Sequence, residues 1–256
     1  MSLRDIAVSK NKVALVTGSA NGIGRACALS LAQSGIDLVL VDLEKETLGV
    51  LYKAITSEGF RATTICGDCQ NAGVLDEVFE TAEREFGGVD ILVNNVGRSA
   101  RECASSFAES TPDTWLSILE ISLMTTLQVT YRAVPRMTEK GWGRIINMSS
   151  DAALVGDAGL ADYAAAKSGL LGFTRVLARE LALHGVTVNA ICPGAIRTRA
   201  HDHLHPSILE RVISDIPMKR VGEPEDVANL VTFLSGDRAG YITGQTIAVN
   251  GGRHMT

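Results

Sequence analysis

The sequence predicts an α/β protein built on a parallel sheet. Seven short apolar runs alternate along the chain with longer segments whose apolar residues recur at helical spacing. Most runs are apolar on consecutive residues instead of every second one, as strands covered on both faces require. No Pro/Gly/Ser-rich linker, repeat or low-complexity tract interrupts the alternation, so residues 1–256 are expected to form one domain.

Each expected strand is a short apolar run that turns polar or glycine-rich before the next helical stretch. In chain order the runs are VALVT (13–17), DLVLV (37–41), ATTI (62–65), VDILV (89–93), GRIINM (143–148), VTVNAI (186–191) and QTIAV (245–249). The segment from about 194 to 217 follows the sixth run and has the least regular pattern. Because ligands bind beyond the carboxyl ends of strands in open parallel sheets, this segment is expected to form a substrate lid.

Composition and charge favour a small-molecule partner. The net charge of −5 argues against nucleic acid and anionic membrane partners, which require a basic surface. The five Cys, at 27, 66, 69, 103 and 192, do not form a disulfide pattern and suit a reducing compartment. No apolar run has the length of a signal peptide or of a membrane span, so we expect a cytoplasmic protein.

A glycine-rich loop follows the first expected strand. Gly18, Gly22 and Gly24 in TGSANGIG stand before a helical stretch. Glycines at such a turn let the backbone approach a pyrophosphate, whose charge the helix N-terminus favours. The spacing differs from the common G-x-G-x-x-G fingerprint and lacks the ending of a P-loop, and a merely structural turn is the alternative.

Asp42 ends the second expected strand and bears on the choice of dinucleotide. A carboxylate there can accept hydrogen bonds from an adenosine ribose and would repel the additional phosphate of NADP. The residue before Gly22 is Asn21, so no basic side chain of the loop compensates. The position therefore favours NAD, the alternative being a solvated acid at a strand end.

Tyr163 and Lys167 stand one helical turn apart in DYAAAKSGLL, so their side chains share a helix face. The pKa of a tyrosine phenol is about 10 in water, and a nearby ammonium lowers that pKa toward neutral pH. The spacing is compatible with an acid/base pair. A Tyr packed over a Lys stem is the alternative.

The motifs occur in a set order: TGSANGIG at 17–24, NNVG at 94–97, Ser150, YAAAK at 163–167 and PGAIRT at 193–198. With this order the chain resembles the short-chain dehydrogenase/reductase family from Lys12 to Gly252. The resemblance implies a Rossmann-like, doubly wound sheet of seven parallel strands with helices on both faces, usually assembled into homotetramers. It also implies hydride transfer between a nicotinamide and an alcohol or carbonyl.

The resemblance assigns catalytic roles. Tyr163 corresponds to the acid/base and Lys167 to its partner, which also bonds the nicotinamide ribose. Ser150 corresponds to the serine that polarises the substrate oxygen. Its neighbour Ser149 competes for this role, but the family's spacing counted back from Tyr163 selects Ser150.

Ser122 stands where many relatives of the family have an Asn, seven residues after a Trp that is Trp115 here. That Asn helps to hold a water on the proton route. A serine hydroxyl has a shorter reach than an amide. We therefore expect the proton relay to be shifted or slowed.

The resemblance also implies a cofactor-binding set. Asp68 would face the adenine amine, residues 94–97 would pass the adenosine ribose, and residues 193–198 would hold the carboxamide. The expected set is Gly18, Asn21, Gly22, Ile23, Gly24, Asp42, Asp68, Asn94, Val96, Gly97, Tyr163, Lys167, Pro193, Gly194, Ile196 and Thr198. Val96 replaces an Ala of many relatives, and for Asn94 and Asn95 a role in tying strands together is the alternative.

Other patterns carry less chemistry. CGDC at 66–69 has the Cys-x-x-Cys spacing of redox and metal sites, but no second Cys pair or suitably spaced His completes a zinc site. The cluster of His201, His203 and His205 is explained equally well by an exposed, polar lid. No metal site is therefore expected. His201 or His203 could instead contact substrate.

Four arginines flank the expected site: Arg98, Arg101, Arg197 and Arg199. Their planar forks suit a carboxylate or phosphate on the substrate, while solvated loop arginines are the alternative.

The sequence thus predicts an enzyme that transfers hydride reversibly between NAD and a secondary alcohol or ketone. One alternative is a 3-oxoacyl-thioester reductase using NADPH, which Asp42 disfavours. The other is a non-catalytic NAD-binding regulatory protein, for which Ser122 is the best support.

Overall fold

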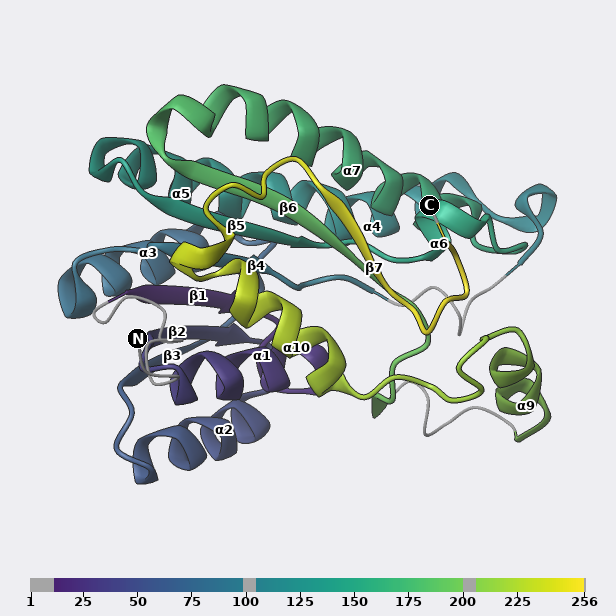
Figure 1. Ribbon diagram of the computed structural model, residues 1–256, viewed down its shortest axis with the longest axis horizontal. Helices are drawn as coiled ribbons and strands as arrows, with labels where there is room; N and C mark the ends of the chain where they lie inside the picture. Colours follow the sequence, from purple (N-terminus) through teal and green to yellow (C-terminus); the bar gives the residue numbers. More distant parts are fainter. Residues whose placement is uncertain (1–11, 99–104, 200–205, 256) are drawn as a thin grey trace.

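A computed structural model describes residues 12–98, 105–199 and 206–255. Seven strands form one sheet, and every neighbouring pair is parallel, in the order β3-β2-β1-β4-β5-β6-β7 (Figure 1). The strands are β1 (Val13–Thr17), β2 (Asp37–Asp42), β3 (Ala62–Cys66), β4 (Ile91–Asn94), β5 (Gly143–Met148), β6 (Val186–Pro193) and β7 (Thr246–Val249). The strand order reverses between β1 and β4, which confirms the predicted doubly wound, Rossmann-like class.

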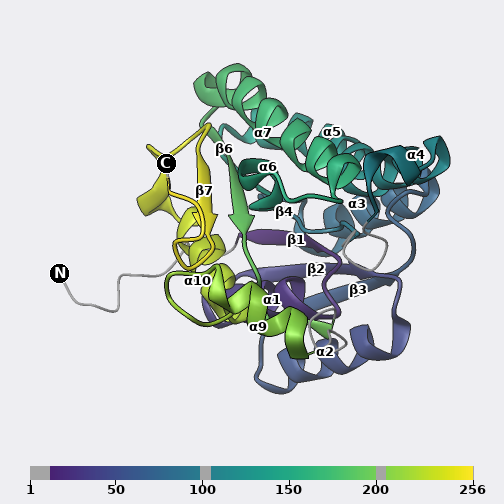
Figure 2. The same ribbon diagram turned by 90° about the vertical axis from the view of Figure 1, so that its right-hand side faces the viewer.

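Helices cover both faces of the sheet (Figure 2). They are α1 (Gly22–Gln33), α2 (Lys45–Ser57), α3 (Ala72–Phe86), α4 (Pro112–Leu119), α5 (Thr125–Lys140), α6 (Ala152–Val155), α7 (Ala161–Leu181), α9 (Pro206–Ser214) and α10 (Pro224–Leu234). Short 3-10 turns form η3 (Phe107–Glu109), η5 (Ala182–His184) and η6 (Asp237–Ala239), and a π-helix, η4 (Glu120–Met124), joins α4 to α5. Within the described ranges, no helix is long and apolar enough to cross a membrane.

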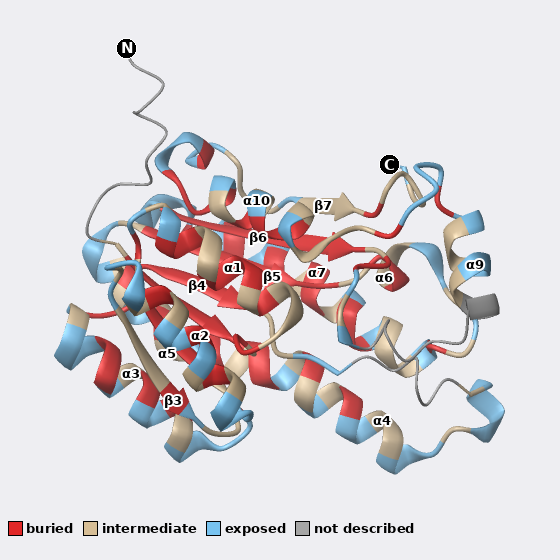
Figure 3. Cartoon of the chain, turned by 90° about the horizontal axis from the view of Figure 1, so that it is seen from below, coloured by how far each residue is buried: buried red, intermediate tan, exposed pale blue. Residues whose placement is uncertain are grey.

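Two separate apolar cores explain why the strands are apolar on consecutive residues. Ala14 and Val16 of β1 pack in the core with α1, α2 and α10, whereas Val13 and Leu15 pack in the core with α3, α5 and α7. The central strands are accordingly buried on both sides (Figure 3). Because alternate side chains pack into different cores, each central strand is held from both faces, which fixes the carboxyl ends of the strands.

Several strand boundaries differ from the prediction. β4 begins at Ile91 and not at 89, although the Asp90 N–H still donates to the Val13 carbonyl (2.9 Å) and the Asp90 carbonyl accepts the Arg144 N–H (3.0 Å). The Asp90 carboxylate also accepts the Val13 N–H (3.1 Å) and pairs with Lys140. β6 continues to Pro193, two residues beyond the expected end, because Pro193 still pairs with Val249. β2 ends at Asp42, the residue expected to close it, while β3 runs one residue further, because Cys66 pairs with Asp42, and β7 begins at Thr246.

Leu40→Ala is expected to lower the free energy of unfolding by about 2–5 kcal/mol, because it leaves a cavity in a tightly packed core. Leu40 is 0% exposed in the middle of β2. Urea unfolding followed by circular dichroism measures the change. Leu43→Ala is the matched control, since Leu43 lies just beyond the same strand and is 63% exposed. Equal losses in the two variants would contradict the assignment of the core.

Candidate active site

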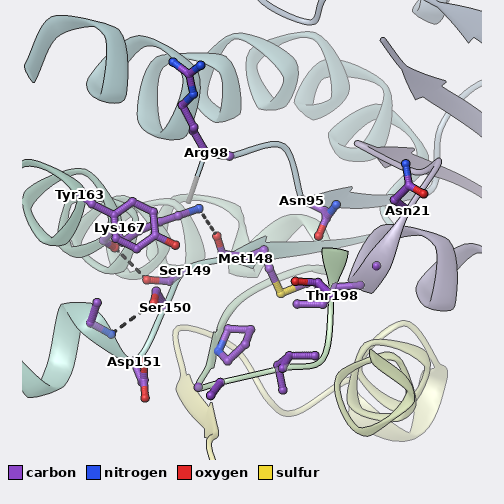
Figure 4. A pocket seen from close by; sticks show the side chains of 18 of the residues that line it. Asn21, Asn95, Arg98, Met148, Ser149, Ser150, Asp151, Tyr163, Lys167 and Thr198 are labelled. Atoms are coloured by element: carbon purple, nitrogen blue, oxygen red, sulfur yellow. Dashed lines mark hydrogen bonds between the residues drawn. The ribbon is translucent and has the colours of Figure 1, made fainter. Parts of the chain in front are cut away.

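A cavity of about 430 Å³ lies at the carboxyl ends of the strands, on the side to which the glycine loop and the 193–199 segment both lead. Tyr163, Lys167 and Ser150 lie at one end of it, and Asn21, Asn95 and Thr198 lie at the other (Figure 4). The expected residues that line it are Asn21, Gly22, Ile23, Gly97, Ser150, Tyr163, Lys167, Pro193, Gly194, Ile196 and Thr198. The sequence motifs thus converge on one cavity of a size typical for ligand sites.

The glycine loop has the geometry of a phosphate cradle. Gly18 and Gly22 adopt positive φ angles of 62° and 50°, which side-chain-bearing residues rarely adopt. A Cβ on Gly24 would stand 2.0 Å from the Gly18 carbonyl oxygen, so only glycine permits this close turn. Asn21, the N-cap of α1, makes no side-chain capping bond. The N-terminal N–H groups of α1 are therefore not capped by that side chain, and the loop fits an anionic dinucleotide.

Two carboxylates stand beside this loop. Asp42 accepts the N–H groups of Ala20 (2.8 Å) and Glu44 (3.0 Å), one on each oxygen. Because each carboxylate oxygen has two lone pairs, Asp42 can still accept a ribose hydroxyl. Glu44 lines the cavity and accepts hydrogen bonds from Asn21 (3.0 Å) and Arg199 (2.8 Å). Hydrogen bonds from Thr47, Arg199 and Asn21 hold the pKa of Glu44 below its usual value.

Lys167 is the most constrained group of the cavity. It lies on α7 one turn after Tyr163, is only 3% exposed, and its ammonium is 5.8 Å from the centre of the Tyr163 ring. The Nζ atom donates to the backbone carbonyl of Met148 at the end of β5 (2.8 Å). Burial lowers the pKa of Lys167 to about 8. The ammonium is therefore fixed close to the phenol whose ionisation it can assist.

Gly97 leaves the space in which Lys167 sits. A Cβ on Gly97 would stand 2.9 Å from Lys167 Nζ and 3.7 Å from the hydroxyl of Ser122. Ser122 is fully buried in the π-helix η4, and its hydroxyl accepts the Arg98 N–H (3.4 Å). Ser122 does not line the cavity, although π-helical turns often occur at functional sites. Its place in a proton relay stays a prediction.

The two neighbouring serines have different partners. Ser149 is buried and donates its hydroxyl hydrogen to the Lys167 carbonyl (2.9 Å). Ser150 lines the cavity, and its hydroxyl oxygen accepts the Ala152 N–H (3.2 Å), which leaves its own hydrogen for another acceptor. Ser149 also lines the cavity, but its hydroxyl hydrogen is already donated to Lys167, so the geometry favours Ser150 as a donor to a substrate.

Some residues of the expected set support the cavity without lining it. Gly18, Gly24, Asp42, Asp68, Asn94 and Val96 are in this group. Asn94 is buried and donates to Asn147 and Thr130 (both 2.9 Å), so it ties β4 to its neighbours, the structural role considered from the sequence. Asp68 accepts the Gln70 N–H (2.9 Å) in the loop after β3, and its contact with adenine stays a prediction.

The arginines expected to bind an anion have mixed surroundings. Arg197 pairs with Glu223 (3.3 Å) and Arg199 with Glu44, whereas Arg98 lines the cavity without an ion pair in the described part of the chain. Arg101 and the three histidines of the expected lid lie outside the described residues. Elsewhere in the described ranges, no cluster of three or more His, Cys, Asp or Glu could hold a metal ion.

Sequence reasoning missed several residues of the cavity. Glu44, Met148, Asp151, Leu160 and Ala195 line it, and none was singled out beforehand. Glu44 stands two residues after Asp42 and Asp151 directly follows Ser150, so their nearness in the sequence was an available signal. Met148 contributes a carbonyl, which no side-chain pattern reveals.

Lys167→Met is expected to remove a pH-dependent contribution to stability. The pKa of Lys167 is about 8 in the folded state against 10.5 for the free side chain, so between these values the unfolded chain binds more protons. The wild type therefore gains stability relative to the variant as the pH rises from 8 to 10.5, and the difference is constant below 8. Denaturant unfolding of both proteins across this range measures it, and a flat difference would contradict the shifted pKa.

Comparisons with known proteins agree with this geometry. Residues 18–254 match the family model described as enoyl-(acyl carrier protein) reductase. The 3-oxoacyl-(acyl-carrier-protein) reductase FabG of Staphylococcus epidermidis is 36% identical over 246 residues, covering 96% of this chain and 100% of the relative. Nodulation protein G of Azospirillum brasilense is 38% identical over 94% of this chain and 97% of its own, and the short-chain reductase protein NovJ of Streptomyces niveus is 38% identical over 97% and 96%.

One conclusion follows from the strand order, from the glycine loop and the cavity that Ser150, Tyr163 and Lys167 line, and from these matches. The chain is an oxidoreductase of the short-chain dehydrogenase/reductase family.

Proposed function

We propose that this protein transfers hydride between a nicotinamide dinucleotide and carbon 3 of a 3-oxoacyl or 3-hydroxyacyl thioester. The observation that carries the chemistry is the buried Lys167 ammonium beside Tyr163, at the end of the cavity that Ser150 also lines. The substrate class is supported by the relatives named 3-oxoacyl-(acyl-carrier-protein) reductase, from two Staphylococcus species. These names favour the thioester alternative over the general secondary alcohol expected from the sequence.

Each residue of the cavity has its own role in the proposed reaction. A bound nicotinamide supplies or accepts the hydride. Ser150 donates a hydrogen bond to the substrate oxygen and stabilises the charge that develops there. Tyr163 gives or takes the hydroxyl proton, and Lys167 lowers the pKa of the phenol through its positive charge. The glycine loop and Thr198 would hold the dinucleotide, and the N-terminus of α1 would favour the negative charge of its pyrophosphate.

NAD(H) is the cofactor we favour within this function. Asp42 and Glu44 place two carboxylates beside the glycine loop, and the nearby cation, Arg199, is already paired with Glu44. An additional phosphate on the adenosine ribose would meet these negative charges. The expected homotetramer, the lid at about 194–217 and the cytoplasmic location stay predictions.

Tyr163→Phe is expected to lower kcat by at least about 100-fold while cofactor affinity changes little, because the variant loses proton transfer but keeps the ring. Absorbance of reduced nicotinamide with acetoacetyl-coenzyme A measures turnover, and fluorescence titration measures binding. Tyr131→Phe is the matched control, since Tyr131 is 79% exposed on α5. Wild-type activity on neutral ketones but on no 3-oxoacyl thioester would overturn the substrate class. Cofactor binding without any turnover would favour a regulatory protein.

Asp42→Ser is expected to shift the ratio of kcat/KM for NADH and NADPH toward NADPH by about tenfold or more, since it removes one repulsive charge. Glu46→Gln is the control, because Glu46 is an exposed acid in the first turn of α2. Steady-state rates with both cofactors measure the ratio. A wild type that prefers NADPH would contradict the proposed cofactor without affecting the hydride-transfer assignment.

A further inference from the structure

A partly buried ion-pair cluster links the C-terminal segment to the loop that carries Ser150. Arg253 Nη1 donates to Asp151 Oδ2 (3.1 Å) and to Asp157 Oδ2 (3.1 Å), and Nη2 donates to the second oxygen of Asp157. The Arg253 side chain is 15% exposed and the Asp151 side chain 2%. These contacts to both carboxylates raise the pKa of Arg253. We call Arg253, Asp151 and Asp157 the Arg253 clamp.

Asp151 joins this clamp to two walls of the cavity. It directly follows Ser150, and its N–H donates to the Pro193 carbonyl (2.9 Å). The next N–H, that of Ala152, donates to the Ser150 hydroxyl (3.2 Å). The Asp151 peptide thus sets both the orientation of Ser150 and the spacing between the β5 and β6 ends.

A glycine allows the three segments to meet. A Cβ on Gly194 would stand 2.8 Å from Asn250 Cβ and 3.1 Å from Asp151 Oδ2. Asn250 shapes the turn that presents Arg253, because its side-chain oxygen accepts the Gly252 N–H (3.1 Å) and its carbonyl accepts the Arg253 N–H (3.2 Å). The ends of β5, β6 and β7 are therefore joined by charge and close packing at the cavity wall, which Asp151 and Gly194 line.

We propose that Arg253 is a positioning residue for the reaction: by holding Asp151, it keeps the Ser150 hydroxyl aimed at the substrate oxygen. This proposal rests on the proposed role of Ser150. Hydrogen-bond donors to a developing charge act only when they are held in place beforehand, and a displacement of about 1 Å can cost up to about 100-fold in rate. A bidentate guanidinium bond restricts orientation more than a single lysine contact does.

The test combines kinetics with amide hydrogen exchange. Arg253→Met is expected to lower kcat by about tenfold with KM and cofactor affinity within about twofold of the wild type, since the lost interaction acts in the transition state. Arg253→Lys is expected to recover part of kcat, because it restores the charge but not the fork. Arg61→Met, which removes the exposed ion pair with Asp37, is the control and leaves kcat unchanged.

A double-mutant cycle separates positioning from general loss of stability. If Arg253 acts through Asp151, then Asp151→Asn together with Arg253→Met loses no more kcat than the more damaging single variant. Losses that multiply in the double variant would overturn the proposal, as would an unchanged kcat in Arg253→Met. If Arg253→Met does not fold, the cycle is run with Arg253→Lys.

Hydrogen exchange needs no turnover and so distinguishes this proposal from the proposed function. Amides of residues 151–154 are expected to exchange about tenfold faster in Arg253→Met than in the wild type or Arg61→Met, because the loop opens locally. Unchanged exchange there would overturn the clamp whatever the activity. A wild type inactive on every 3-oxoacyl thioester would instead refute the proposed function, and the exchange result would then decide the clamp by itself.

Discussion

The burial of the Lys167 ammonium is the constraint on which the rest of the site depends. A desolvated charge is costly unless it has a close polar partner, and here the partner is the Met148 carbonyl at the last residue of β5. That bond requires α7 to pack directly on the end of β5, and it requires a glycine at position 97 to leave room. The position of Tyr163 follows, because it lies on the same face of α7 one turn earlier.

The same arrangement links the two ends of the cavity. Thr17 at the end of β1 accepts the N–H groups of Asn95 and Val96, and Asn95 in turn donates to the carbonyls of Thr17 and Gly18. The glycine loop is thereby bonded to the segment that leads to Gly97. Hydrogen bonds between side chains and backbone thus fix the glycine loop relative to the segment beside Lys167, as precise chemistry between the two ends of the cavity would require.

The sequence predicted the sheet well, and it predicted that Tyr163 and Lys167 share a helix face, because both features have local patterns. The strands are covered on both faces and so read as continuous apolar runs, and Tyr163 and Lys167 have helical spacing. The exact strand ends were less predictable, because they depend on pairing with strands that are distant in the sequence: Pro193, for example, pairs with Val249 of β7. Glu44 and Arg253 were missed as partners of distant residues, since the pairing of Arg253 with Asp151 depends on how the ends of three strands converge.

The division of the interior into two cores has a consequence for how this protein can diverge. Alternate residues of one strand belong to different cores, and the sheet separates the packing of α1, α2 and α10 from that of α3, α5 and α7. Substitutions on opposite sides share no side-chain neighbours, and the effects of distant substitutions on stability usually add. One lineage can therefore repack the apolar core on the side of α1, α2 and α10 while the core on the side of α3, α5 and α7 stays unchanged.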